Sequence, residues 1–334
     1  MSVLVTGATG HIGNVLVRQL VKNGEKVKAL LLPSEDDLPL RGLDVEIVRG
    51  DVCHIDSMVQ SFKGVDTVYH LAGIISISSG HEEILHRVNV QGTQNVIKAC
   101  EVNSVNRLVY TSSIHALNEP PHGTVIDESC PPDPNHVLGE YAKCKAQATL
   151  EVKEAVQQGL DAVIVCPTGV IGPYDFRISE MGQLILDFTR KRLKAYLDGA
   201  YDFADVRDVA RGMQLAGKKG RRGETYILSG EQVSIKDLMR ILQDVTGIKA
   251  PSYKVPSWLA RTAGVVAPFY YRLIKSKPLF TTYSIDVLAS NSLVTSQKAR
   301  IELGYRSRPA SESIADAVHW FVSNLKMQLA PGRV

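Results

Sequence analysis

Apolar residues in the first half of the chain alternate between short continuous runs and longer stretches with helical spacing. The runs occupy residues 2–7, 26–32, 44–51, 66–73, 107–113 and 161–173, and their length and continuity predict strands. The stretches between them, at 11–24, 55–62, 82–103 and 138–158, predict helices. Strands that alternate with helices form parallel sheets covered on both faces, and such buried strands are apolar throughout. The pattern therefore predicts an α/β fold with a doubly wound parallel sheet.

Beyond Pro173 this alternation becomes irregular. The helical stretch MGQLILDFTRKRL is followed by short strands such as GETYILSG, and SIADAVHWFVSNL near the end is amphipathic. The segment from Val255 to Leu273 is apolar and aromatic. It fits either the wall of a pocket for a bulky, weakly polar ligand or a pair of packed amphipathic helices. We expect this part of the chain to form a smaller lobe rather than an independent domain.

Composition and charge exclude several classes of protein. The chain has 334 residues and a net charge of +3 with histidine neutral, so no strong field favours nucleic acid. No apolar run reaches the roughly 20 residues that span a bilayer, and no signal peptide precedes the first strand, so we expect no membrane partner. The five cysteines and nine histidines are scattered without metal-ligand spacing. We expect no metal site, and reduced thiols in the cytoplasm.

A glycine-rich loop, TGATGHIG, joins the first strand to the first helix. Gly7 permits the tight turn, Gly10 lets the backbone approach a pyrophosphate, and Gly13 allows the helix to pack closely on the strand. The N–H groups at the start of that helix favour phosphate. Because the glycines lie in a strand-turn-helix context, they predict a dinucleotide-binding sheet of the Rossmann type. The residues of this loop predicted to bind the cofactor are Gly7, Thr9, Gly10, His11, Ile12 and Gly13.

The pair Tyr141 and Lys145, in the sequence EYAKCKAQ, is a candidate reaction centre. Residues four apart lie on one face of a helix, so the phenol and the ammonium would point at one spot. A free tyrosine titrates near about pH 10, and a positive charge one turn away favours the phenolate and lowers its pKa. The pair suits general acid or base chemistry, although the same spacing also arises on the surfaces of ordinary helices.

With these features the chain resembles the extended branch of the short-chain dehydrogenase/reductase superfamily. The resemblance covers nearly the whole chain and is strongest for the dihydroflavonol-4-reductase-like group of the NAD-dependent epimerase/dehydratase family. It implies an NAD(P)-binding domain over residues 1–173, joined by later segments near 203–230, and a substrate-binding lobe formed mostly by 174–334. The motifs that carry it are TGATGHIG, GDV (50–52), HLAG (70–73), VNVQGTQNV (88–96), YTSS (110–113), YAKCK (141–145), CPTGVIGP (166–173), DVRDVARG (205–212) and ELGYRSRP (302–309).

The resemblance implies a role for each matching residue. Ser113 would hold the reacting oxygen, Tyr141 would exchange a proton with it, and Lys145 would lower the pKa of the tyrosine and hold the nicotinamide ribose. Asn89 and Asp208 would be structural. The other implied cofactor-binding residues are Asp51 and Val52 at the adenine, Leu71, Ala72 and Gly73 beside the fourth strand, Thr111, and Pro167, Thr168, Gly169 and Val170 on the nicotinamide side.

The neighbours of Ser113 leave alternatives open. Ser112 or Thr111 takes the role of the serine if the register differs by one residue. His115 is expected to be a loop residue rather than an acid, and Cys144 is expected to point away from the site and pack. Dehydratases of the family carry an Asp-Glu pair directly after the catalytic serine or threonine. Ile114 and His115 stand there instead, which disfavours dehydration.

The form of the cofactor depends on the residue that closes the second strand. An acid there holds the ribose 2′-hydroxyl of NAD, whereas a nearby arginine accepts the 2′-phosphate of NADP. The chain has Leu32, Pro33 and Ser34 at this place, followed by Asp36 and Asp37. The sequence predicts NAD(P), with NAD favoured over NADP because no arginine occupies the expected position.

Three functions remain open. The first is an NAD(P)-dependent oxidoreductase that interconverts a hydroxyl and a carbonyl on a small-molecule substrate. The second is a nucleotide-sugar 4-epimerase with retained NAD, although Tyr201 and Asp202 stand where such enzymes bring an arginine to the substrate phosphates. The third is a non-catalytic NAD(P)-sensing module, which commonly loses the tyrosine or the lysine that this chain keeps. The resemblance also implies a homodimer that pairs through helices 82–103 and 138–158.

Overall fold

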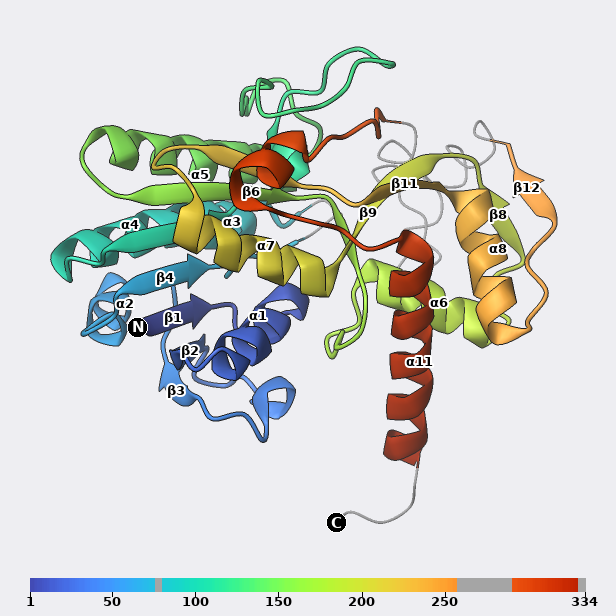
Figure 1. Ribbon diagram of the computed structural model, residues 1–334, viewed down its shortest axis with the longest axis horizontal. Coiled ribbons are helices and arrows are strands. Elements are labelled where there is room, and N and C mark those ends of the chain that lie inside the picture. Colours follow the sequence, from blue (N-terminus) through green and yellow to red (C-terminus); the bar gives the residue numbers. More distant parts are fainter. Residues whose placement is uncertain (76–79, 257–289, 330–334) are drawn as a thin grey trace.

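The computed structural model describes residues 1–75, 80–256 and 290–329, and their main sheet has seven parallel strands (Figure 1). The strand order is β10-β6-β5-β4-β1-β2-β3. This order confirms the predicted doubly wound parallel sheet. The strands are β1 (Ser2–Thr6), β2 (Lys26–Leu31), β3 (Glu46–Arg49), β4 (Thr67–His70), β5 (Arg107–Thr111), β6 (Ala162–Pro167) and β10 (Thr225–Leu228). Most of the apolar segment Val255–Leu273 lies outside the described residues.

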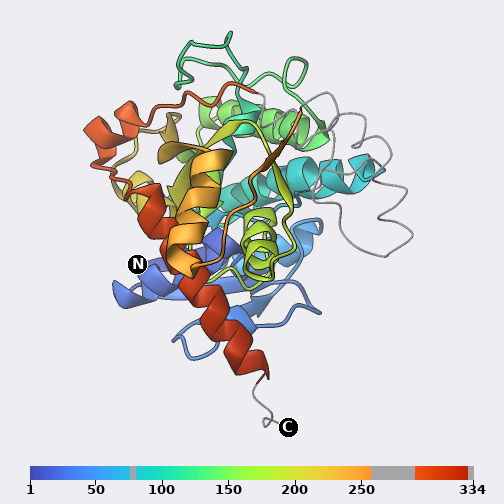
Figure 2. The ribbon, with the colours of Figure 1, turned by 90° about the vertical axis from the view of Figure 1, so that its right-hand side faces the viewer.

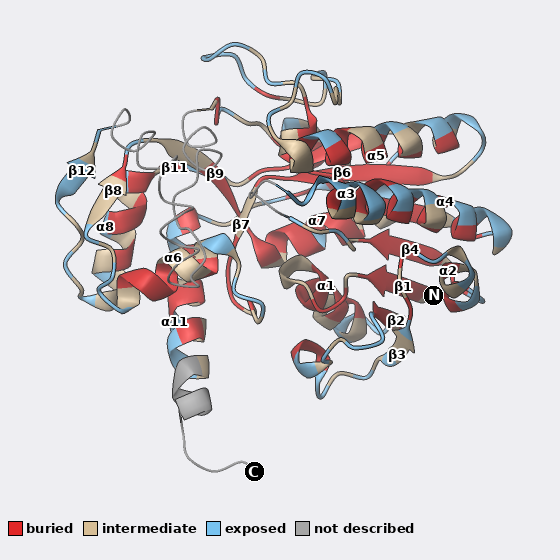
Figure 3. Ribbon diagram, turned by 180° about the vertical axis from the view of Figure 1, so that it is seen from behind, coloured by how far each residue is buried: buried red, intermediate tan, exposed pale blue. Residues whose placement is uncertain are grey.

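Helices cover both faces of this sheet, and each face has its own core. On one face lie α1 (His11–Lys22) and α7 (Val206–Lys219), and on the other lie α2 (Ile55–Ser61), α4 (Gly92–Val102) and α5 (Glu140–Gln157). Val3 and Val5 of β1 point to the first face and Leu4 to the second, because side chains alternate along a strand. Figure 3 shows these central strands buried between the helices. A short 3₁₀ turn, η1 (Leu38–Leu40), follows β2.

The predicted helix over residues 82–103 contains a wider turn in its middle. It consists of α3 (Glu82–His86), the π-helical turn η2 (Arg87–Gln91) and α4. Asn89 lies in this turn, and its side-chain oxygen accepts the N–H of Ile74 while its amide donates to the carbonyl oxygen of Ile74, both over 2.9 Å. Asn89 therefore holds the segment after β4 against the helix, as expected of a structural residue. π turns of this kind are frequent at functional sites.

The predicted strand over residues 161–173 is two strands in different sheets. β6 ends at Pro167, and β7 (Gly169–Ile171) pairs with β9 (Ala200–Asp205) in a three-stranded sheet completed by β11 (Glu231–Ser234). An apolar run shows that a segment is buried, but it does not show which strand lies beside it. The single strand predicted from the sequence was wrong in this respect.

The smaller lobe is built around a third core. It contains that three-stranded sheet and a pair formed by β8 (Ala195–Leu197) and β12 (Tyr253–Val255). Around them pack α6 (Glu180–Thr189), α8 (Ile235–Thr246) and α11 (Ala310–Leu329). Figure 2, seen from the side of this lobe, shows α8 and α11 in front of the main sheet. None of the described helices has both the length and the apolar composition needed to cross a membrane.

Two of the late sequence motifs meet where the chain returns to the main sheet. The carboxylate of Asp208 in α7 accepts the backbone N–H of Arg308 over 2.8 Å and its guanidinium over 2.9 and 3.0 Å. The π-helical turn η4 (Ala299–Leu303) leads into the second motif, and its Leu303 is buried against α7. The DVRDVARG and ELGYRSRP motifs are therefore a structural pair, which agrees with the role expected of Asp208.

Candidate active site

The carboxyl ends of β1 and β4 meet at the point where the strand order reverses, which is where open α/β sheets bind ligands. Gly7 follows β1 with a φ of +66°, and a Cβ on it would lie 2.7 Å from the nitrogen of Ala72 and 2.8 Å from the carbonyl carbon of Leu71. The Thr6 hydroxyl accepts the N–H groups of Leu71 and Ala72 over 3.1 and 3.0 Å. The predicted residues of the glycine loop and those after β4 are thus in direct contact.

A buried histidine fixes this junction. His70 Nδ1 lies 2.8 Å from the hydroxyl of Thr6, and its Nε2 lies 3.1 Å from the hydroxyl of Thr93 in α4. Burial lowers the pKa of His70 to about 3, so the imidazole is neutral. A neutral ring that joins two hydroxyls ties the ends of β1 and β4 to the helix behind them.

Helix α1 begins directly above the glycine loop. Gly10 precedes its first turn and donates its N–H to the carbonyl oxygen of Gly7 over 3.0 Å, and Asn14 donates its N–H to Gly10 over 2.9 Å. A Cβ on Gly13 would overlap the carbonyl oxygen of Gly7, so the helix packs against the loop as only glycine allows. The unpaired N–H groups of a first helical turn suit a pyrophosphate. The cradle therefore fits a dinucleotide.

A loop from the smaller lobe lies against the start of α1. His11 Nε2 is 3.0 Å from the carbonyl oxygen of Pro173, and Asn14 donates its side-chain amide to the carbonyl oxygen of Tyr174 over 3.1 Å. The guanidinium of Arg18 lies 4.7 Å from the ring centroid of Tyr174. Burial lowers the pKa of His11 and keeps it neutral. His11, a predicted cofactor residue, thus contacts the loop at Pro173. Its neighbour Ile12 is partly buried against the core under α1.

Glu35 reaches the glycine loop from beyond β2. A turn closed by the N–H of Glu35 and the carbonyl oxygen of Leu32 (3.1 Å) folds the chain back, and the N–H of Leu32 then donates to the Glu35 carboxylate over 2.9 Å. The same carboxylate accepts the hydroxyl of Thr9 and the guanidinium of Arg177, and Arg177 also donates to Thr9 over 2.9 Å. An acid therefore lies beside the glycine loop. The sequence analysis found no acid there because it considered only the residues at the end of the second strand.

Asp51 and Val52 lie at the same edge of the sheet. The N–H of Gly50, just before them, donates to the carbonyl oxygen of Leu31 at the end of β2 over 2.9 Å. The carboxylate of Asp51 accepts the N–H of Cys53 over 2.9 Å. Val52 is buried against Gly92 of α4, and a Cβ added to Gly92 would lie 2.9 Å from the Val52 side chain. The predicted adenine-side residues are thus held rigidly near the start of α4.

Lys145 is a buried ammonium at the centre of the site. Its Nζ donates to the carbonyl oxygen of Thr111 at the end of β5 over 2.8 Å and lies 5.2 Å from the ring centroid of Tyr110. It also lies 3.6 Å from where a Cβ on Gly73 would be. Burial lowers the pKa of Lys145 to about 8. Along the described parts of the chain no carboxylate pairs with it.

Tyr141 lies one turn before Lys145, in the first turn of α5. The residue that precedes this helix, Gly139, has a φ of +86° and turns the chain into it. Tyr110 is a buried residue of β5, and its pKa is raised first by burial and then by the nearby phenol of Tyr141. Tyr141, like Lys145, therefore lies close to the end of β5. Cys144 points to the other side of α5, where it packs with Leu85 as expected.

The two serines after β5 have different partners. Ser112 is buried, and its hydroxyl lies 2.7 Å from that of Thr149 in α5. Ser113 opens a 3₁₀ turn, η3 (Ile114–Ala116), and accepts the N–H of His115 over 3.2 Å. The buried hydroxyl of Thr111 has no hydrogen-bond partner among the described residues. Because Ser112 is engaged with α5, Ser113 remains the better candidate for the catalytic serine.

The predicted nicotinamide-side residues lie at the turn between β6 and β7. The Thr168 hydroxyl donates to the carboxylate of Asp202 over 2.6 Å, and the N–H of Gly230 donates to the same oxygen over 2.8 Å. Burial raises the pKa of Asp202. A Cβ on Gly169 would lie 2.5 Å from the ring of Tyr201, so this ring packs directly against the glycine. Pro167 and Val170 flank this turn in the two strands.

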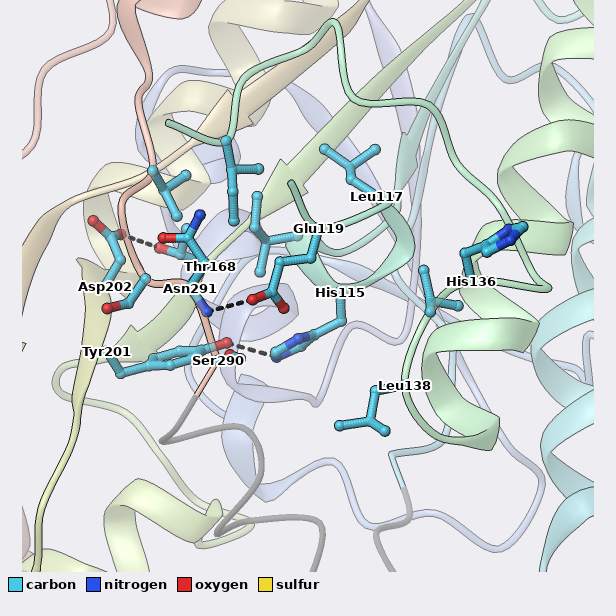
Figure 4. A pocket seen from close by; sticks show the side chains of 15 residues that line it. His115, Leu117, Glu119, His136, Leu138, Thr168, Tyr201, Asp202, Ser290 and Asn291 are labelled. Atoms are coloured by element: carbon cyan, nitrogen blue, oxygen red, sulfur yellow. Dashed lines mark hydrogen bonds between the residues drawn. The ribbon is translucent and has the colours of Figure 1, made fainter. Parts of the chain in front are cut away.

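A pocket of about 100 Å³ lies beside this turn and beside η3 (Figure 4). His115 and Tyr201 both line it and meet there, with 2.6 Å between Nε2 and the phenolic oxygen. The carboxylate of Glu119 accepts the N–H of Asn291 at its rim. Its apolar lining is Ile114, Leu117, Ile126, Val137, Leu138 and Val294. No lysine or arginine occurs among the described residues that line it.

Sequence reasoning missed three residues of this site. Glu35 stands in the sequence between the end of β2 and the two aspartates Asp36 and Asp37. Its contact with Thr9 depends on the turn at Leu32, which the sequence does not show. His115 was expected to be an ordinary loop residue, and Tyr201 had no role. The position of His115 two residues after the catalytic candidate Ser113 was a usable signal. No signal in the sequence pairs it with Tyr201, which is 86 residues away.

A glycine cradle at the switch point, a buried lysine one turn after a tyrosine, and an adjoining pocket define an NAD(P)-dependent enzyme of the extended short-chain dehydrogenase/reductase type. Residues 3–229 match the NAD-dependent epimerase/dehydratase family. The chain belongs to this family, which confirms the resemblance drawn from its motifs.

Known relatives span nearly the whole chain. It is 37% identical to sterol demethylase protein B of Methylococcus capsulatus, over 96% of this chain and 98% of that protein. It is 35% identical to a dihydroflavonol 4-reductase-like protein of Synechocystis sp., over 95% and 93%. Among solved structures, gox2253 is 32% identical and superimposes with a TM-score of 0.85, covering 97% of this chain and 98% of that one.

Proposed function

We propose that this protein is an NAD-dependent oxidoreductase that interconverts a hydroxyl and a carbonyl on a small-molecule substrate, with Ser113, Tyr141 and Lys145 as its catalytic residues. The observation that carries the proposal is the buried ammonium of Lys145, held by the carbonyl oxygen of Thr111 and paired with no described carboxylate. An ion buried without a counter-ion is costly, and such groups cluster at functional sites.

The proposed roles follow from the charges and hydrogen bonds of these three side chains. The positive charge of Lys145 favours the phenolate of Tyr141, which then takes a proton from a substrate hydroxyl or, as the phenol, gives one to a carbonyl. Ser113 donates a hydrogen bond to the reacting oxygen and stabilises its developing charge. A nicotinamide cofactor held by the glycine cradle would supply the hydride chemistry, as NAD⁺ for oxidation of the hydroxyl and as NADH for reduction of the carbonyl. The buried Thr111 hydroxyl and the glycine cradle are available to the cofactor.

The preference for NAD over NADP rests on Glu35. Its carboxylate lies against Thr9 of the glycine loop, where it suits the hydroxyls of an adenosine ribose. A 2′-phosphate at the same place would meet a negative charge. Arg177 pairs with Glu35 and neutralises part of that charge, and both side chains lie against the hydroxyl of Thr9.

The relatives and the pocket support a bulky, weakly polar substrate. Two relatives are named for sterol and dihydroflavonol chemistry, and six apolar side chains form part of the wall of the pocket beside Ser113. We assign substrate binding to the lobe formed mostly by residues 174–334, which contributes Tyr201, Asp202 and Asn291 to the pocket. Dimer formation through helices 82–103 and 138–158 stays a prediction.

The two other functions have less support. A nucleotide-sugar epimerase must hold a diphosphate, and the described pocket wall offers Glu119 and Asp202 but no lysine or arginine. A cofactor sensor without chemistry does not need both the tyrosine and the lysine, and this chain keeps both on one face of α5. We therefore do not favour either of them.

The decisive experiment compares wild type with Tyr141→Phe. Reduction of a panel of cyclic and polycyclic ketones with NADH is followed by the loss of nicotinamide absorbance, and NADH affinity is measured by fluorescence. We expect kcat to fall by about 10²–10⁴-fold, the usual contribution of general acid–base catalysis, with the dissociation constant for NADH little changed. The matched control is Tyr253→Phe, which removes the same hydroxyl from an exposed residue of β12. Equal rates in wild type and Tyr141→Phe, or no ketone reduced by wild type, contradict the proposal.

A further inference from the structure

Arg177 is a basic side chain that the smaller lobe places on the glycine loop. Its Nη2 donates to the hydroxyl of Thr9 over 2.9 Å and to the carboxylate of Glu35. A guanidinium has five N–H donors, and Nη2 supplies only two of them. Within the described parts of the chain, Nε and Nη1 donate to no other residue, and the side chain is 58% exposed. Arg177 can therefore donate to a ligand on the glycine loop while it keeps its contacts with Thr9 and Glu35.

The loop that carries Arg177, residues 172–178, has an unusual backbone. Tyr174 and Ile178 have φ values of +70° and +52°, in the left-handed region that residues other than glycine seldom adopt. Such conformations cost free energy, persist only where surrounding contacts enforce them, and cluster at functional sites. Asp175 provides one such contact, since its buried carboxylate accepts the N–H of Ser179 over 2.8 Å and the hydroxyl of Ser179 over 2.7 Å. The conformation of this loop is therefore fixed by its own side chains.

The same loop packs on both parts of the molecule. On the side of the smaller lobe, Phe176 meets the ring of Trp320 in α11 edge to face, with centroids 5.1 Å apart. On the side of the main sheet, the guanidinium of Arg18 in α1 lies over the ring of Tyr174. Contacts in both directions hold the loop across the start of α1. They set the position of Arg177 beside the glycine loop.

An anion is the ligand that suits this position. The first turn of α1 contains no acidic residue, and its N–H groups and helix dipole favour phosphate oxygens. A guanidinium binds phosphate through charge-assisted hydrogen bonds. Glu35 balances the charge of Arg177 but occupies only Nη2, so the remaining donors still attract an anion on the glycine loop.

We propose that Arg177 is a cofactor-binding residue contributed by the smaller lobe, and that its guanidinium binds the diphosphate of the dinucleotide. Glu35 then serves the adenosine ribose, and Arg177 serves the diphosphate beside it. This inference rests on the proposed function, because it takes the glycine loop as the site of the NAD dinucleotide. It also makes the smaller lobe part of the cofactor site, since the loop of Arg177 packs on α11.

The test measures the binding of cofactor fragments that undergo no hydride transfer. Full-length wild type and Arg177→Gln are titrated by calorimetry with ADP-ribose, which has the diphosphate, and with adenosine and 2′-AMP, which lack it. We expect Arg177→Gln to weaken the binding of ADP-ribose by about tenfold or more, and to change that of adenosine by less than about twofold. Arg177→Lys keeps the charge without the planar fork, and it should show a smaller loss.

A control variant and a change of salt complete the design. Arg240→Gln removes the same charge from an exposed residue of α8 in the same lobe, and it should leave all three affinities unchanged. Because the Arg177 side chain is largely exposed, salt should screen its attraction for the diphosphate. The difference between wild type and Arg177→Gln should therefore shrink as salt is raised from about 20 mM to about 0.5 M.

The outcomes separate phosphate binding from a merely structural role. Unchanged affinity for ADP-ribose in Arg177→Gln, or no binding of ADP-ribose by wild type, would overturn the inference. So would equal weakening of ADP-ribose and adenosine, or a loss that salt leaves undiminished, because either result would make Arg177 a structural link between the lobes. A loss confined to 2′-AMP would place the guanidinium at a 2′-phosphate instead. Ketone reduction is measured in other samples, so the proposed function and this inference can fail independently.

Discussion

Lys145 donates a hydrogen bond over 2.8 Å to the carbonyl oxygen of Thr111, and this contact ties the first turns of α5 to the end of β5. The carbonyl is the direct hydrogen-bond partner of the ammonium in a place from which water is largely excluded. A neutral partner compensates only part of the lost hydration, and this is why burial lowers the pKa of Lys145 to about 8. The site therefore contains a charge that destabilises the folded protein.

This cost has a pH dependence that can be measured. Because the pKa of Lys145 is lower in the folded protein than in the unfolded chain, the unfolded chain binds more protons between about pH 8 and pH 10.5. The penalty is complete below about pH 8 and disappears as the pH rises to about 10.5. Relative to Lys145→Met, wild type should gain up to about 3 kcal/mol of unfolding free energy over this range. Urea denaturation at several pH values measures it, with exposed Lys143→Met as control, and a pH-independent difference would contradict the lowered pKa.

Glu35 should control the choice of cofactor. Glu35→Gln removes the charge and keeps the shape, and it releases Arg177 to meet a 2′-phosphate. A hydrogen bond to a charged group contributes about 1.5–3 kcal/mol, so NADH binding should weaken by about tenfold or more while NADPH binding improves. Fluorescence titration with both cofactors measures the ratio. Asp36→Asn is the matched control, because Asp36 pairs with Arg41 at the surface. An unchanged ratio in Glu35→Gln would remove Glu35 from the ribose site.

Two glycines of the same loop should respond differently to alanine. A Cβ on Gly13 would overlap the carbonyl oxygen of Gly7, whereas a Cβ on Gly10 would lie 3.2 Å from that atom. Gly13→Ala must therefore push α1 away from the loop, and it should cost about 1–3 kcal/mol of stability as well as cofactor affinity. Gly10→Ala should lower NADH affinity with a smaller loss of stability. Thermal unfolding and NADH titration measure the stability and the cofactor affinity of both variants. A lower stability of Gly10→Ala than of Gly13→Ala would contradict the prediction.

The buried neutral histidines predict sensitivity to acid. The pKa of His70 is about 3 in the folded protein, so below about pH 6.5 the unfolded chain binds more protons. Unfolding free energy should then fall by up to about 1.4 kcal/mol for each pH unit from this residue, and His115 adds to the slope down to about pH 4. His70→Gln should flatten the profile, and exposed His54→Gln should not. Denaturation between pH 7 and pH 4 tests this, and identical slopes in wild type and His70→Gln would show that His70 is not the origin.

The sequence predicted those parts of the molecule that depend on local pattern. Gly7, Gly10 and Gly13 lie within one turn and helix start, and Tyr141 and Lys145 lie on one helix, so spacing alone placed each set. The parallel strands followed from apolar runs. These features depend on backbone geometry within a few residues, which periodicity describes well.

The parts that were missed depend on contacts between distant segments. Glu35 reaches Thr9 only through a turn whose direction the sequence does not show, and its partner Arg177 is 142 residues further along the chain. Tyr201 meets His115 because β9 pairs with β7, and the sequence showed no separate β7. A rule that considers only the residue at the end of β2 does not find Glu35, because a turn at Leu32 brings this residue back to the glycine loop.

The position of β10 has a consequence for synthesis on the ribosome. This edge strand pairs with β6, and α7 packs on the same face as α1, yet the chain passes through β7, α6, β8 and β9 before it makes either of them. During synthesis, the edge of β6 that pairs with β10 and the sheet face that α7 covers stay exposed until residues 206–228 have left the exit tunnel. Figure 1 shows the two elements in place against the sheet. The cofactor sheet is therefore completed only after part of the other lobe has emerged. A nascent chain that stops near Pro173 would present a bare apolar edge to chaperones and to other nascent chains.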